Sequence, residues 1–232
     1  MATAAGEHVR ANESLLARAE RRVLHQLAAR LPAWVMPDHL TTLGLLASTL
    51  VGVGYALSNR NPHWLWLVNG AVVLNWFGDS LDGTVARYRK TERPRYGYYL
   101  DHLTDAYSTL AIGLGLGFSP YMLLSVGLAV IVAYLLLSVN VYLETHVFGE
   151  FTFSYGSFGP TEVRIALIVL NLFALALGPA SFSLLVVRVT VFDVVGVAIA
   201  GGMLGMLLGR AIGNLRRLAR LEPPRRWTPP LA

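Results

Sequence analysis

The chain has 232 residues, of which 54% are hydrophobic and only 14% charged, and its net charge is +5 at pH 7. A soluble domain carries about 25% charged residues, so this deficit, with several apolar runs of about 20 residues, predicts an integral membrane protein. The sequence contains no cysteine, which excludes disulfides, zinc–thiolate sites and thiol catalysis.

Lysine and arginine gather in three short segments, with five in residues 10–30, five in 87–95 and six in 210–226. Basic clusters beside apolar spans mark the cytoplasmic side of a membrane, where they meet anionic lipid headgroups. Because the clusters adjoin spans, we expect a lipid bilayer as the partner of these basic residues and no nucleic acid. Both termini are predicted to be cytoplasmic.

The first 36 residues form a cytoplasmic segment whose central part predicts an amphipathic helix. In "NESLLARAERRVLHQLAARLP" (12–32) leucine, valine and alanine recur at helical spacing, with charged residues between them. The helix is expected to begin near Ser14 and to stop at Pro32. We place it on the cytoplasmic surface of the bilayer, and packing on the protein's own cytoplasmic face is an equal alternative.

Residues 37–220 are expected to form one transmembrane domain. It contains six apolar spans, at about 38–58, 63–89, 95–120, 120–145, 160–178 and 189–212. Asp38 is predicted to cap the first of these helices, and residues 221–232 are expected to be a disordered cytoplasmic tail. The predicted fold is therefore an all-α integral membrane protein with six transmembrane helices preceded by an amphipathic juxtamembrane helix.

One stretch concentrates acid in this apolar chain: "DSLDGTVARYRKTERPRYGYYLDHLTD", residues 79–105. On the second span Asp79 and Asp82 share a face, roughly 100° wide, with Asn75, Gly83 and Ala86. On the third span Asp101 and Asp105 lie four residues apart and share a face as well. Because the basic loop between the spans is short, we expect antiparallel neighbours whose cytoplasmic ends bring the two carboxylate pairs face to face.

Four carboxylates cannot share a half-buried site without a compensating positive charge, so either they stay protonated or cations bind there. Carboxylate oxygens without cysteine or histidine suit Mg²⁺, Ca²⁺ or Mn²⁺, and a pair of such ions serves displacement at phosphorus. Gly83 and Ala86 leave the helix surface bare for a bulky ligand. Arg87, one turn beyond Gly83, can reach a phosphate.

At this point the residues carry a resemblance to a known family. The pattern Asp79-x-x-Asp82-Gly83-x-x-Ala86-Arg87, followed by Gly97-x-x-x-Asp101-x-x-x-Asp105, resembles the signature of the CDP-alcohol phosphotransferases. Nine residues separate Arg87 from Gly97, one more than in that signature. Members are integral membrane enzymes with six spans that make phospholipid headgroup linkages. "PDHLT" (37–41) is similar to the family's entry into its first helix.

The resemblance implies a role for each matched position. Asp79, Asp82, Asp101 and Asp105 would hold two Mg²⁺ or Mn²⁺ ions, and Asp105 would also be the catalytic base. The nucleotide of the donor would meet residues from the signature, the entry into the first helix and the basic loop: Asp79, Gly83, Ala86, Arg87, Gly97, Asp38, Thr41 and Thr91. Arg164, at the cytoplasmic entry to the fifth span, is the candidate contact for the acceptor.

The implied reaction transfers a substituted phosphate group from a CDP-linked donor to an alcohol, with release of CMP, at the cytoplasmic side of the membrane. CDP-diacylglycerol with a soluble alcohol is the favoured pairing. "GPTEVR" (159–164) and the Asp101–His102 pair resemble the choline and ethanolamine branch, so CDP-choline or CDP-ethanolamine with diacylglycerol is the alternative.

Three other interpretations stay open. A non-enzymatic cation-binding or transport protein would also use intramembrane acids, although these usually lie near the bilayer midplane on several helices. His102 could ligate a metal or relay protons, or it could simply pack at the interface. "GGMLG" (201–205) permits close helix packing, and a homodimer contact there is an open alternative.

Overall fold

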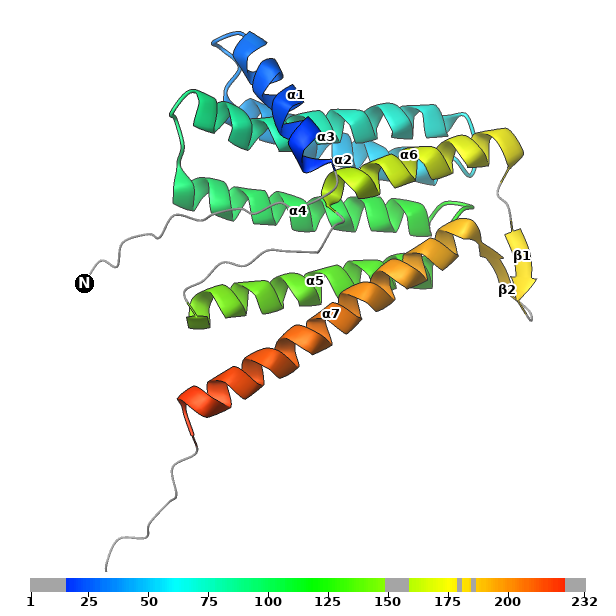
Figure 1. Ribbon diagram of the computed structural model, residues 1–232. Coiled ribbons are helices and arrows are strands. Elements are labelled where there is room, and N and C mark those ends of the chain that lie inside the picture. Colours follow the sequence, from blue (N-terminus) through cyan, green and yellow to red (C-terminus); the bar gives the residue numbers. More distant parts are fainter. Residues whose placement is uncertain (1–15, 149–158, 179–180, 185–186, 224–232) are drawn as a thin grey trace, which may run out of the picture.

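The computed structural model describes residues 16–148, 159–178, 181–184 and 187–223 (Figure 1). Within them the chain forms seven helices and one short hairpin: α1 Ala17–Arg30, α2 Pro37–Leu57, α3 Trp64–Tyr88, α4 Pro94–Gly117, α5 Leu124–Phe148, α6 Pro160–Leu177, β1 Ser181–Leu184, β2 Val187–Thr190 and α7 Val191–Leu221. Helices α2 to α7 begin and end close to the six expected spans. The helical class is confirmed.

Four of these helices are long and apolar enough to cross a membrane, namely α2, α5, α6 and α7. Helices α3 and α4 have 25 and 24 residues. At 1.5 Å per residue each is about 36 Å long, which exceeds the hydrocarbon core. They are less apolar because they carry the four motif aspartates. The count of six spans therefore stays a prediction.

Helix α2 organises the bundle by packing closely against both α3 and α4. Glycines make these approaches close: a Cβ on Gly78 of α3 would lie 2.5 Å from the backbone of Leu40 and Gly44, and one on Gly115 of α4 would lie 2.5 Å from Gly52 O. Among the described helices, α3 and α4 are not a closely packed pair. The expected direct contact between them is therefore replaced by a shared contact with α2.

The remaining helices extend this group on two sides. Helix α6 packs against α3, while α5 packs against α4 and is crossed by α7 (Figure 1). Helix α1 packs against α3, and its Leu24 and Ala28 are buried with Leu40 and Leu81. The guanidinium of Arg89 donates to the carbonyl oxygens of Leu31 and Pro32 at 3.0 and 2.9 Å, which holds the end of α1. The amphipathic helix thus packs on the protein, the second of its two expected arrangements.

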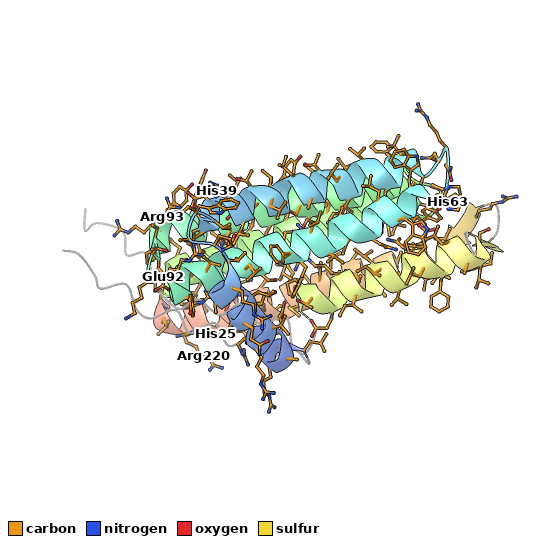
Figure 2. All side chains as sticks on the ribbon, turned by 90° about the horizontal axis from the view of Figure 1, so that it is seen from above. His25, His39, His63, Glu92, Arg93 and Arg220 are labelled. Atoms are coloured by element: carbon orange, nitrogen blue, oxygen red, sulfur yellow. The ribbon has the colours of Figure 1, made fainter. Side chains whose placement is uncertain are left out.

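Different parts of the chain meet at the two ends of the bundle. Figure 2 shows His39, Glu92 and Arg93 at one end and His63 at the other. The hairpin lies at the end opposite the α3–α4 connection (Figure 1). This antiparallel hairpin pairs Ser181 with Thr190 and was not predicted, because its strands are too short to show a periodic pattern.

Helix α7 begins with a reciprocal cap beside the hairpin. The Asp193 carboxylate accepts from the Thr190 N–H at 2.8 Å, while the Thr190 hydroxyl accepts from the Asp193 N–H at 3.2 Å. Asp193 also accepts from the Leu123 N–H at 2.7 Å. This buried acid, outside the motif, therefore has a structural role.

Candidate active site

The first aspartates of the motif lie on α3 where two other helices bring polar partners. Arg164 of α6 donates from Nη2 to Asp79 Oδ2 at 2.6 Å and from Nε to Asn75 Oδ1 at 2.9 Å. Thr41 of α2 donates from its hydroxyl to Asp82 Oδ2 at 2.7 Å. Asn75 completes the link by donating to Gly44 O at 3.0 Å. Helix α3 thus presents its carboxylates between α2 and α6.

A small cleft opens beside these groups, between α2, α3 and α4. Its lining includes Thr41, Asn75 and Asp79, and α4 contributes Thr104 and Ser108. The Arg164–Asp79 pair is half-buried. Hydrogen-bonding groups from three helices therefore face one small space.

The second pair of aspartates lies on α4 and approaches the first pair across this region. Asp79 and Asp101 both lie close enough to Asp82 for electrostatic repulsion between the charged carboxylates. Between Asp101 and Asp105 on α4, the ring of His102 lies 5.2 Å from that of Tyr142 on α5. Asp101 is the member of the second pair that this repulsion ties to Asp82, and the facing of the two whole pairs stays a prediction.

The donor set suits a hard divalent cation in its chemistry, since it offers carboxylate and hydroxyl oxygens. As the side chains stand in the described part of the chain, no three acidic or histidine groups converge on one point. Asp79 instead faces the guanidinium of Arg164, which supplies the compensating positive charge. Because Arg164 contacts Asp79 through Oδ2, an ion held by these carboxylates would share Asp79 with that guanidinium.

The next signature residues lie at the exposed end of α3. The guanidinium of Arg87 rests over Gly83, where an added Cβ would be 3.2 Å from Arg87 Nη1. Ala86 accepts at its carbonyl oxygen from the Thr91 N–H at 2.9 Å, and the intervening Lys90 has a φ of 56°. This left-handed residue ends the helix and turns the chain into the basic loop.

Gly97 and Asp38 complete the predicted set. Gly97 lies exposed in the first turn of α4, and an added Cβ there would meet no atom within 4 Å. The prediction that Asp38 caps α2 is wrong, because the N-cap is Met36, whose N–H donates to His39 Nδ1 at 3.2 Å. Asp38 lies in the first turn and pairs with Arg93 of the basic loop. This hydrogen bond raises the pKa of Arg93, so its guanidinium stays charged.

His102 packs among aromatic rings beside the α4 aspartates. Its Nδ1 lies 2.7 Å from Tyr98 O, so this nitrogen carries the proton and donates it. Its ring lies 4.1 Å from that of Tyr98 and 5.2 Å from that of Tyr142, measured between centroids. Tyr142 was not predicted, because one tyrosine in an apolar helix gives no periodic signal.

The part of the chain that carries these aspartates matches a family of known proteins. The family model for CDP-alcohol phosphatidyltransferase matches residues 34–204, which include the whole signature. The chain belongs to this family. The resemblance predicted from the sequence is thereby confirmed, and the family is one of transferases that move phosphate-containing groups. This weighs against the alternative of a non-enzymatic cation-binding protein.

Individual relatives of this CDP-alcohol phosphatidyltransferase family member include proteins of two kinds. The chain is 27% identical to cholinephosphotransferase 1 of Danio rerio over 77% of its own length and 48% of the relative's. It is 30% identical to that of Gallus gallus over 66% and 48%. It is 35% identical to the phosphatidylinositol phosphate synthase of Cutibacterium acnes over 40% and 44%. The chain thus spans about half the length of the relatives it matches.

Proposed function

We propose that this protein is a phospholipid-biosynthesis enzyme that transfers a substituted phosphate group from a CDP-linked donor to an alcohol hydroxyl and releases CMP. The observation that carries the proposal is that Thr41 of α2 and Arg164 of α6 bind Asp82 and Asp79 beside a cleft that α4 also lines. Family membership supports the same reaction class. The basic loop beside these aspartates would attract the phosphates of a nucleotide.

The four motif aspartates, Asp79, Asp82, Asp101 and Asp105, would hold Mg²⁺ or Mn²⁺, two ions in the proposed form. When bound, these ions would neutralise the donor pyrophosphate and make CMP a better leaving group. On the protein side, Arg87 would bind a donor phosphate over the bare surface of Gly83 and Ala86. Thr41 would hold Asp82 in a fixed orientation. The nucleotide would extend along the exposed start of α4 at Gly97 and past Asp38 and Thr91.

Asp105 is the proposed general base. The acceptor hydroxyl oxygen attacks the phosphorus, the bond from phosphorus to the CMP oxygen breaks, and the hydroxyl proton passes to the Asp105 carboxylate. We expect Asp105→Asn to lower turnover at least a hundredfold, because an amide cannot accept that proton. Near-normal turnover by this variant, with metal still bound, would contradict the assignment.

Two classes of CDP-linked donor fit this proposed reaction. CDP-diacylglycerol with a soluble alcohol is our first pairing, with Arg164 as the acceptor contact. The relatives named cholinephosphotransferase match a larger share of this chain than does the phosphatidylinositol phosphate synthase. That observation favours a second candidate, a CDP-choline or CDP-ethanolamine donor with diacylglycerol as acceptor.

The membrane setting follows from the chemistry of either pairing. One substrate has acyl chains and the other a water-soluble part, so the site has to open to both phases. We propose six spans, with the site and both termini on the cytoplasmic side. Arg93 and Arg220, from two of the basic segments, lie toward the end of the bundle away from His63 (Figure 2), which supports this orientation.

The test is CMP release by the purified protein in detergent with Mg²⁺ or Mn²⁺. CDP-diacylglycerol would be offered with serine, glycerol phosphate, inositol phosphate or inositol, and CDP-choline or CDP-ethanolamine with diacylglycerol. Acceptor-dependent CMP from one pairing would identify donor and acceptor together. If no pairing released CMP from folded, metal-binding protein, the proposed reaction would be wrong.

A further inference from the structure

Helix α6, which carries Arg164, has few fully buried residues for a helix with a place in the site. Its principal helix contact is with α3, and only Asn171 and Ala174 of its 18 residues are buried. Its apolar packing lies from the middle of the helix onward, where Leu167, Ile168, Leu170 and Leu175 pack against the core that includes Ala174. The first turns of α6, which include Arg164, precede this apolar packing and are held by polar contacts.

Those polar contacts follow one face of α6 as three anchors. Thr161 donates to Glu20 Oε1 at 2.6 Å, in the first turn of α6. Arg164 meets Asn75 and Asp79, as described above. Further along, Asn171 lies in a buried network, where it accepts from Tyr55 at 2.9 Å and donates to Asn69 at 2.8 Å.

Glu20 belongs to α1 and joins α6 to α3 through one carboxylate oxygen. The oxygen that accepts from Thr161 also accepts from the indole N–H of Trp76 at 2.7 Å. A second contact joins the start of α1 to the start of α6, because Glu162 Oε1 accepts from the Leu16 N–H at 3.1 Å. Helix α1 lies outside residues 34–204, so family membership assigns it no role.

We propose that Glu20 is a positioning residue, which fixes the first turn of α6 against α3 and thereby sets Arg164 at Asp79. Thr161 precedes Arg164 by three residues, one helical turn on the same face, so an anchor at Thr161 controls where the guanidinium points. The N-terminal helix then acts on the site without touching substrate. The kinetic part of this inference rests on the proposed function, whereas the structural part does not.

The structural part can be tested by spin-label distances, because the chain has no cysteine and labels attach only where one is introduced. Labels at Val163→Cys on α6 and Leu46→Cys on α2 lie at exposed positions. In Glu20→Ala the distance distribution should broaden relative to the parent protein. In Glu20→Gln it should stay narrow, because the amide oxygen still accepts from Trp76 and Thr161.

Two further variants serve as a control and as an independent test of the distance measurement. Arg22→Gln changes the charge of α1 at an exposed position and should leave the distribution unchanged. Thr161→Val removes only the bond to Glu20 and should broaden it as Glu20→Ala does, even if Glu20→Ala itself folds poorly. An unchanged distribution in the folded variants would overturn the proposal.

The link to Arg164 can be tested by a double-mutant cycle on CMP release. We expect Glu20→Ala and Arg164→Gln each to lower kcat/KM about tenfold, with the same kinetic parameter affected in both. The double variant should be no slower than Arg164→Gln alone, because Glu20 would act through Arg164. If the two losses in kcat/KM multiplied in the double variant, Glu20 would not act through Arg164. If the parent protein released no CMP in any pairing, the proposed function would fail, and the distances alone would decide whether Glu20 positions α6.

Discussion

At the scale of single residues, the two aspartates of α3 are held in different ways. Asp79 faces a cation, Arg164, whereas Asp82 accepts a neutral hydrogen bond from Thr41. A hydrogen bond to one carboxylate oxygen fixes the direction in which the other oxygen points. Such support around a metal ligand commonly contributes tenfold or more to metal affinity.

The variant Thr41→Val tests this support. We expect the Mg²⁺ concentration for half-maximal CMP release to rise about tenfold, because Asp82 Oδ2 then loses the hydrogen bond from Thr41 and only Oδ1, bonded to the Gly83 N–H, stays held. Thr42→Val is the matched control, since the Thr42 hydroxyl donates only to the Asp38 carbonyl oxygen at an exposed position. Equal Mg²⁺ dependence in the two variants would show that Thr41 does not orient a metal ligand.

At the scale of helices, the site depends on how closely α2 and α3 approach. Gly78 immediately precedes Asp79, and an added Cβ would lie 2.5 Å from the backbone of α2. Gly78→Ala should therefore push the helices apart and lower the free energy of unfolding by about 2 kcal/mol or more. Gly70→Ala is the control on the same helix, because its Cβ would meet no atom within 4 Å.

Thermal unfolding in detergent measures both variants. Gly70→Ala should be neutral or stabilising by about 0.5 kcal/mol, since alanine favours helix more than glycine does. Equal stability of the two variants would mean that the close approach at Gly78 does not support the bundle.

The sequence predicts the helices better than their packing. Pro37, Pro94 and Pro160 lie at the first positions of α2, α4 and α6, where proline is favoured, and the apolar runs between polar loops give the rest. The direct packing expected between α3 and α4 was wrong because it was argued from loop length. The contacts that bring α2 between them depend on glycines far apart in the chain, such as Gly52 and Gly115.

For the candidate site, too, the sequence predicts the motif residues but not their partners on other helices. The spacing of Asp79, Asp82, Asp101 and Asp105 identifies the family, but it gives no sign of which side chains reach them from other helices. Arg164 could be proposed because it is one of few cations outside the basic segments. Glu20 could not, because one half-buried acid in an amphipathic helix cannot be told in the sequence from the acids of its solvent-exposed face.

At the scale of the whole molecule, the orientation in the membrane can be tested with introduced cysteines. Glu92 and His63 lie at opposite ends of the bundle (Figure 2) and are both exposed. In sealed vesicles of known orientation, an impermeant maleimide should label Glu92→Cys from the cytoplasmic side and His63→Cys only from the other side. Labelling of both from one side would contradict the proposed six-span topology.

The role proposed for the four aspartates is to support transfer of a substituted phosphate group from a CDP-linked donor. Acceptor-dependent release of CMP is the direct test of that role. The purified protein would be assayed with each donor, with and without acceptor, in Mg²⁺ and after chelation, beside Asp82→Asn. We expect CMP release that requires both acceptor and divalent ion and that falls at least a hundredfold in the variant. CMP release that was unaffected by chelation, or that Asp82→Asn retained, would contradict it.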